Sequence, residues 1–82
     1  MDATRIEELI HEGLPGATVV DVTTRSDHHE DDHYEATVVA NEFDGESLVA
    51  QHQLVFDTLD GYMTTDIHAL ELSTYTPEEY DG

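Results

Sequence analysis

Residues 65–72 read Thr-Asp-Ile-His-Ala-Leu-Glu-Leu and alternate between apolar and polar side chains, with one histidine in the alternation. This pattern predicts a β-strand, in which side chains two residues apart lie on the same face. His68, Leu70 and Leu72 therefore share a face. An imidazole in line with two leucines is either a hydrogen-bonded core histidine or a ligand held at the end of a strand. The residues alone favour the core histidine.

The first half of the chain predicts a helix followed by two strands. Thr4 and Glu7 have the spacing of a capping box, which predicts a helix over about residues 4–12 with Thr4 as its N-cap. β-Branched residues dominate 17–24, and apolar and polar residues alternate over 33–40, as is typical of strands. The stretch between the strands is polar and predicts a loop, so the two strands should form an antiparallel hairpin.

The second half predicts another helix before the last strand. Ser47 is a candidate N-cap for a helix that runs to about Leu59, and Tyr62-Met63 predicts a short further helical turn. The last strand is expected over 67–75, and residues 76–79 should begin a final helical turn whose Tyr80 packs back. The apolar stripe of the longer helix is predicted to comprise Leu48, Val55, Phe56 and Leu59.

Together these elements predict a single domain over residues 1–82. Its class is α+β, with the element order α-β-β-α-(α)-β and a three-stranded mixed sheet covered by helices on one face. A chain of 82 residues can bury one modest core. No apolar run approaches the roughly 20 residues of a membrane span, and no signal peptide is evident, so the expected location is the cytoplasm.

The charge balance is extreme, with 20 Asp and Glu against 2 basic residues and a formal net charge of −18. Such a charge normally favours disorder, but the periodic apolar residues predict a folded core. Molar salt shortens the Debye length to about 3 Å, so that dense surface carboxylates no longer repel one another. The composition therefore indicates a halophilic protein that needs salt to stay compact.

The chain contains six histidines and no cysteine. Imidazole nitrogen is a ligand suited to iron, zinc or copper, whereas disulfides and thiolate ligands are excluded. His28, His29 and His33 lie in or beside a stretch crowded with carboxylates, which on the residues alone is a solvated acidic loop. His52 has apolar residues four positions away on each side, which favours a half-buried structural or partner-facing role. His11 is expected at the surface.

Four ordered segments of the chain resemble the BolA proteins. No single segment is specific, but the ordered set extends over nearly the whole chain. The resemblance implies a type II KH-like fold, and the acidic composition adds a halophilic archaeon as the expected source. The segments are Phe43-Asp44-Gly45, Leu48-Val49 followed by His52, Val55 and Phe56, then Ile67-His68-Ala69-Leu70-x-Leu72, and Thr74-Tyr75-Thr76-Pro77.

The resemblance also implies a partner and a cofactor. In the BolA family, a pair with a monothiol glutaredoxin shares a [2Fe–2S] cluster, to which the glutaredoxin contributes a cysteine and a bound glutathione or equivalent thiol. The family ligand in the Ile-His-Ala-Leu stretch matches His68, and the other matches His28 or His29, with His33 less favoured. The implied role is cluster assembly, trafficking or iron sensing, by a monomer that forms a heterodimer with its partner.

The alternative function is a DNA-binding transcriptional regulator that uses the KH-like fold. Gln51 and Gln53 flank His52 where the family usually carries basic residues, and the Gly13-x-x-Gly16 string lies between a helix and a strand. A charge of −18 gives phosphate contact almost no support, so this alternative ranks second. An enzyme is not expected, because no carboxylate lies in an apolar stretch and no nucleophile motif is present.

Overall fold

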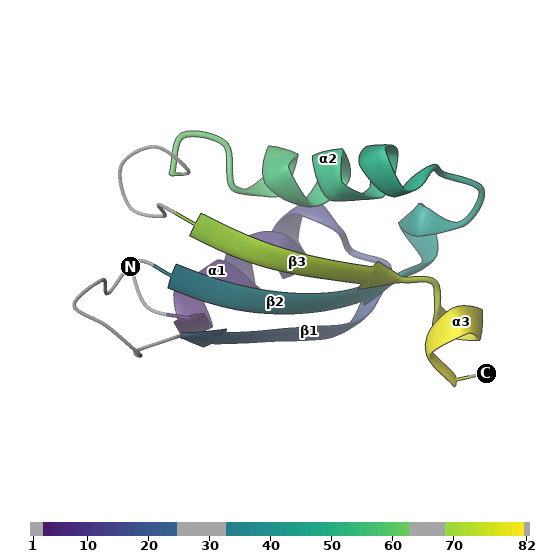
Figure 1. Ribbon diagram of the computed structural model, residues 1–82, viewed down its shortest axis with the longest axis horizontal. Helices are drawn as coiled ribbons and strands as arrows, with labels where there is room; N and C mark the ends of the chain where they lie inside the picture. The colour runs from purple at the N-terminus through teal and green to yellow at the C-terminus, as the bar shows by residue number, and fades with distance from the viewer. Residues whose placement is uncertain (1–2, 25–32, 63–68, 82) are drawn as a thin grey trace.

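The computed structural model describes residues 3–24, 33–62 and 69–81. Its three strands form one sheet in the order β1-β2-β3, with β1 and β2 antiparallel and β2 and β3 parallel (Figure 1). The predicted α+β class with a three-stranded mixed sheet is confirmed. The elements are α1 (Ala3–Gly13), β1 (Ala17–Thr24), β2 (His33–Ala40), the 3-10 helix η1 (Asn41–Phe43), α2 (Leu48–Thr58), β3 (Ala69–Tyr75) and α3 (Pro77–Asp81).

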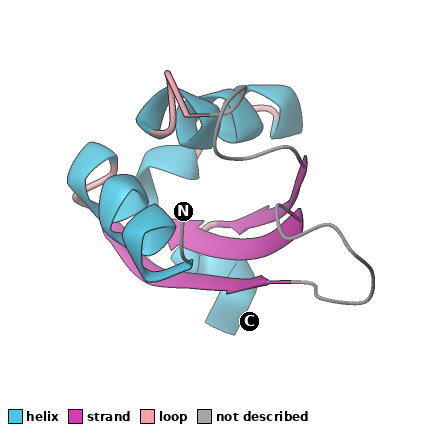
Figure 2. Cartoon of the chain, turned by 90° about the vertical axis from the view of Figure 1, so that its left-hand side faces the viewer, coloured by secondary structure: helices cyan, strands magenta, loops and turns pink. Residues whose placement is uncertain are grey.

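The core lies between the sheet and the two longer helices. α1 and α2 cover the same face of the sheet (Figure 2). Alternate residues of β2 point toward them, because the side-chain period of a strand is two. The buried cluster takes Tyr34, Ala36, Val38 and Ala40 from β2, Val22 from β1, Ile6 and Ile10 from α1, Leu14 from the connection after α1, Phe43 from η1, Val55 from α2, and Leu59 directly after α2.

The short helix α3 lies on the other face of the sheet, at the end where β2 and β3 finish (Figure 2). Val39 points to this face and is only 1% exposed. Its register partner in β3 is Tyr75, whose ring lies 5.7 Å from that of Tyr80 in α3, centroid to centroid. The predicted packing of Tyr80 back onto the strand is therefore confirmed.

The capping box predicted at Thr4 is wrong. The helix already includes Ala3, so Thr4 lies inside it. The Glu7 carboxylate does not fold back onto the helix; its Oε2 accepts a hydrogen bond from the backbone N–H of Val22 at 3.0 Å. A bond to the neighbouring strand has replaced the local one, because the backbone donor on β1 also needs an acceptor.

The predicted cap of α2 is confirmed, but its predicted stripe is only partly right. The Ser47 hydroxyl accepts from the Ala50 N–H at 3.2 Å. The buried residues Val55 and Leu59 lie one turn apart, as expected, whereas Leu48 is 61% exposed and Phe56 half-buried. The inward position one turn before Val55 is taken by a polar residue, described below.

Two further predictions fall partly outside the described residues. The last strand is observed from Ala69 to Tyr75, and residues 67 and 68 of the prediction are not described. Tyr62 closes a hydrogen-bonded turn, with its N–H donating to the Leu59 carbonyl at 3.0 Å, while Met63 lies outside. Within the described ranges, no helix is long and apolar enough to cross a membrane.

Candidate functional site

The two chain segments that carry the predicted ligands join the sheet at the same end. Thr24, the last residue of β1, pairs with Tyr34 near the start of β2. His33, the first residue of β2, is the register partner of Ala69, the first residue of β3. Neighbouring strands are about 4.8 Å apart, so the starts of β2 and β3 lie side by side. We call this region the histidine end of the sheet.

The predicted ligands His68, His28 and His29 lie outside the described residues. In sequence, each adjoins a described strand: His68 directly precedes Ala69, the first residue of β3, and His29 comes four residues before His33, the first residue of β2. The assignment of His68 and the choice between His28 and His29 stay predictions.

The structure describes His11 and His52 in full and the backbone of His33. His33 opens β2 and belongs to the histidine end by its backbone position. His11 is exposed in the last turn of α1, as predicted, and His52 is half-buried in α2, also as predicted. The described part of the chain contains no group of three or more histidine and carboxylate side chains that could hold a metal ion.

Gln51 has a structural role that the sequence pattern did not reveal. Its Oε1 accepts a hydrogen bond from the Thr74 hydroxyl at 2.7 Å, and its Nε2 donates to the Glu46 carbonyl at 2.9 Å. The side chain thus ties α2 to β3 at the inward position one turn before Val55. A lysine or arginine has no acceptor atom and cannot satisfy Thr74, which is 9% exposed, in this way. In the sequence, the only sign of this role is that Gln51 lies four residues, about one helical turn, before the buried Val55.

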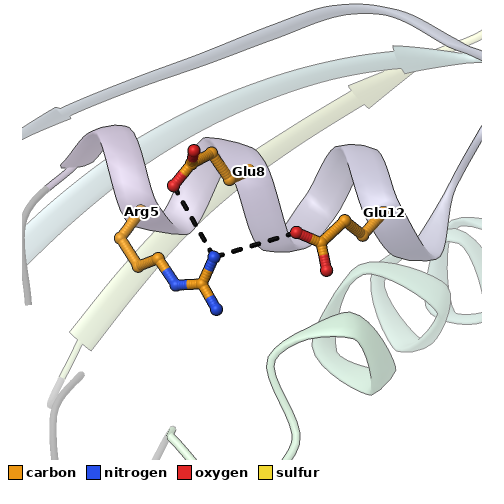
Figure 3. Close-up of polar contacts among 3 residues, drawn as sticks. All are labelled: Arg5, Glu8 and Glu12. Atoms are coloured by element: carbon orange, nitrogen blue, oxygen red, sulfur yellow. Dashed lines mark ion pairs between the residues drawn. The ribbon is translucent and has the colours of Figure 1, made fainter.

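Little positive charge is available on the described surface. The Arg5 guanidinium lies 3.6 Å from a Glu8 carboxylate oxygen and 3.8 Å from one of Glu12 (Figure 3). The second arginine, Arg25, lies outside the described residues. Arg5 is therefore engaged by carboxylates of its own helix, which leaves it poorly suited to recruit a phosphate.

The Gly13-x-x-Gly16 string is used for close packing. The Gly16 N–H donates to Glu42 Oε2 at 2.8 Å, and a Cβ on Gly16 would meet the same carboxylate. A Cβ on Gly13 would lie 2.8 Å from the Cβ of Thr58 in α2. The Glu42 carboxylate thus accepts the backbone N–H that a phosphate-binding loop would donate to a phosphate. The predicted interpretation of the string as a turn is confirmed.

Comparison with known proteins gives a consistent result. The family model described as BolA-like protein matches residues 11–79. The chain is 32% identical over 85 residues to the DNA-binding transcriptional regulator BolA of Escherichia coli (strain K12), covering 94% of this chain and 81% of that protein. The structure of a bolA protein homologue from Coxiella burnetii matches with a TM-score of 0.81 and 34% identity over 100% of this chain and 99% of that one. The BolA domain of SufE1 from Arabidopsis thaliana matches with a TM-score of 0.82 and 30% identity, covering 94% and 93%. The chain belongs to the BolA-like protein family.

Proposed function

We propose that this chain is the partner of a monothiol glutaredoxin and shares a [2Fe–2S] cluster with it through histidine ligands, in iron–sulfur cluster assembly or trafficking or in iron sensing. In this proposal it is not an enzyme. The observation that carries the proposal is the pairing of His33 with Ala69, because it sets the residue next to His68 beside the start of β2. Membership of the BolA-like family supports the same role.

The donor set of the chain fits such a cluster only with a partner. Imidazole replaces thiolate on one iron of Rieske [2Fe–2S] centres. The chain has six histidines and no cysteine, so all thiolate ligands must come from the glutaredoxin and its bound thiol. Bound between the two proteins, the cluster supplies iron, sulfide and one-electron redox chemistry. His68 would hold it from the start of β3, and His28 or His29 from the segment that leads into β2.

The test is anaerobic co-expression with a monothiol glutaredoxin, read by visible absorption of the purified complex. His68→Ala should remove or shift the charge-transfer bands, because an iron loses a nitrogen ligand. His28→Ala and His29→Ala, made separately, identify the second ligand as the one whose loss changes the spectrum. His11→Ala is the matched control, because it removes an exposed imidazole from α1. An unchanged spectrum for His68→Ala would falsify the ligand assignment.

Partner binding and cluster binding are separate outcomes of the same experiment. A complex that forms without visible absorption, even when iron and sulfide are supplied, would make the chain an interaction module without a metal. Size-exclusion chromatography of the apo proteins measures this directly. We expect a heterodimer whose spectrum depends on His68.

The second candidate function is DNA binding, which the similarity to the Escherichia coli DNA-binding transcriptional regulator BolA favours. The charge of this chain opposes it, because phosphate contact needs lysine or arginine and the net charge is −18. We expect the lone protein not to retard duplex DNA in a gel at any salt concentration. Retardation that weakens steeply with added salt would reverse the ranking of the two functions.

A further inference from the structure

The two edges of the sheet differ in how their backbone groups are engaged. β1 and β3 are the outer strands, because the strand order is β1-β2-β3 (Figure 1). The edge of β1 is blocked in its middle by α1, whose Glu7 accepts the backbone N–H of Val22 at 3.0 Å. An outer strand with unengaged backbone groups is a template for a further strand, and such a bond prevents that pairing. On the outer side of β3, no backbone group bonds to another described residue.

The bond of Glu7 also shows which backbone groups of β3 point outward. Because the Val22 N–H points away from β2, Val22 and its register partner Ala36 form a non-hydrogen-bonded pair. The N–H and C=O of Ala36 therefore point toward β3. In a parallel ladder such a residue bonds to the two neighbours of its register partner, which is Leu72. The N–H and C=O of Leu72 thus point away from the sheet, as do those of Leu70, because the direction alternates along a strand. We call this side of residues 69–75 the open edge.

The apolar side chains along the open edge are incompletely covered. Leu70 and Leu72 pack against the core cluster but are only half-buried. Their register partners Tyr34 and Ala36 are 2% and 3% exposed. A strand added beside β3 would place every second side chain on the face of the two leucines and would complete their burial.

The opposite face of the open edge favours positive charge. Glu71 lies between the two leucines in sequence, so its exposed side chain points to the other face of the sheet. Its register partner is Glu35, which is also exposed, and like charges on paired positions are destabilising. A lysine or arginine of an added strand, placed beside Glu71, would offset this repulsion.

We infer that the open edge binds an extended segment of another protein, which alternates apolar residues with lysine or arginine and adds a fourth strand antiparallel to β3. Its backbone would bond to Leu70 and Leu72, its apolar side chains would cover both leucines, and a basic side chain would lie beside Glu71. The antiparallel direction is favoured because that pairing is the more stable per residue. A second copy of this chain fits poorly, because its β3 carries a glutamate and no basic residue and its net charge is −18. The binding uses no metal ligand and goes beyond the proposed cluster role.

Hydrogen exchange of the free protein tests the direction of the backbone groups. We expect the amides of Leu70 and Leu72 to exchange roughly tenfold faster, or more, than those of Glu71 and Ser73. The latter two donate to β2 and exchange only when the strands separate. A uniform rate along residues 70–73 would contradict the outward direction and overturn the inference.

Binding is tested by NMR titration of the 15N-labelled protein with acetyl-Val-Lys-Val-Lys-Val amide, at the lowest KCl concentration that preserves the circular dichroism signal. We expect saturable shifts at the amides of residues 69–75 and slower exchange at Leu70 and Leu72. The same peptide N-methylated at its three valines keeps every charge and side chain but loses the N–H groups that face β3. It should bind roughly tenfold more weakly, or less still. N-methylation of the two lysines should be tolerated, because their N–H groups point away from β3. Equal binding of all three peptides would indicate general attraction to an acidic protein and overturn the inference.

A pair of variants tests the position of the basic residue. Glu71→Gln should weaken the unmodified peptide roughly two- to fivefold, the range of a cross-strand charge pair. Asp60→Asn removes an exposed carboxylate in the turn after α2 and should leave the affinity unchanged. Equal weakening by the two variants would contradict a basic side chain beside Glu71.

Two further measurements distinguish other occupants of the open edge. Sedimentation at the NMR concentration should show a monomer; a dimer that the unmodified peptide dissociates would make a second copy the occupant and overturn the inference. Excess peptide should leave the cluster spectrum of the glutaredoxin complex unchanged, whereas its loss would assign the open edge to the glutaredoxin and contradict a separate partner. Failure of the peptide titration leaves the cluster proposal intact, and loss of the His68 effect leaves the open edge intact.

Discussion

Glu7 links a helix to the outer strand of the sheet through a single carboxylate. Its Oε2 accepts from the Val22 N–H at 3.0 Å. We expect Glu7→Ala to lower the free energy of unfolding by about 1 kcal/mol, because the strand loses its acceptor. Glu7→Gln keeps a side-chain oxygen and should cost clearly less. Urea unfolding in molar salt measures both, and equal losses would mean that the bond contributes nothing specific.

Gly13 is a residue whose size matters more than its conformational freedom. Its backbone is ordinary helix, where alanine is favoured by about 1 kcal/mol. A Cβ there would lie 2.8 Å from the Thr58 Cβ and nearer still to its Cγ2 methyl. Overpacking costs about 1–3 kcal/mol, so we expect Gly13→Ala to be destabilising overall by about 1 kcal/mol. Thermal unfolding followed by circular dichroism measures the effect.

A second variant tests the cause of that loss. Thr58→Ser removes the Cγ2 methyl and keeps the hydroxyl that donates to the Val55 carbonyl at 2.6 Å. In the Thr58→Ser background, Gly13→Ala should lower the free energy of unfolding by less, because the Cγ2 methyl is gone. Some loss should persist, because the contact with the Cβ of residue 58 remains. A double-mutant cycle without coupling would place the origin of the effect elsewhere.

At the scale of elements, α3 depends on a capping box. The Thr76 hydroxyl accepts from the Glu79 N–H at 3.2 Å, and the Thr76 N–H donates to Glu79 Oε1 at 2.9 Å. A helix of five residues has little stability of its own, so Thr76→Ala should release α3 and cost about 1 kcal/mol. Hydrogen exchange at residues 78–81 should rise.

The matched control for that prediction is Ser47→Ala, which removes the hydroxyl cap of α2. Because α2 carries core residues, we expect Ser47→Ala to lower the free energy of unfolding of the whole domain by about 1 kcal/mol. Hydrogen exchange in α3 should then change no more than exchange at the other amides. Similar protection patterns in the two variants would show that α3 does not open on its own.

The strands were the most predictable elements. β1 and β2 begin and end at the predicted residues, because β-branched composition and alternation are local properties of each segment. The capping boxes were less predictable. The Thr-x-x-Glu spacing occurs at Thr4 and at Thr76, but the carboxylate at Glu7 bonds a distant strand and the one at Glu79 bonds locally. Only the tertiary packing distinguishes them.

The candidate site was predictable in part. Resemblance to the family supplied the histidines, and the strand register sets the start of β2 against that of β3. The sequence predicted helices over one face of the sheet, whereas α3 lies on the second face (Figure 2). The pair Val38-Val39 is apolar on both faces, and a single sequence does not show which short element covers the outer one.

At the scale of the whole molecule, charge dominates. The net charge of −18 is spread over a chain whose Cα radius of gyration is 12.4 Å. The Debye length is about 30 Å at 0.01 M salt and about 3 Å at 1 M, so carboxylates across the molecule repel one another only in dilute salt. The compact state therefore bears a repulsion that the expanded state relieves, and added salt should stabilise the fold.

We expect the urea midpoint to rise steadily with KCl from millimolar to molar concentration, and the far-ultraviolet circular dichroism to weaken at the lowest salt. Sucrose at equal osmolality is the control, because it favours burial of apolar surface without screening charge. In dilute salt, sucrose should therefore restore less of the circular dichroism signal than KCl does. Replacing Glu8, Glu12, Asp60 and Glu78 by their amides should flatten the salt dependence, since each is exposed and outside the core. A circular dichroism signal that is the same in millimolar and molar salt would show that the apolar core carries the fold without screening of the carboxylates, and would contradict the adaptation to salt.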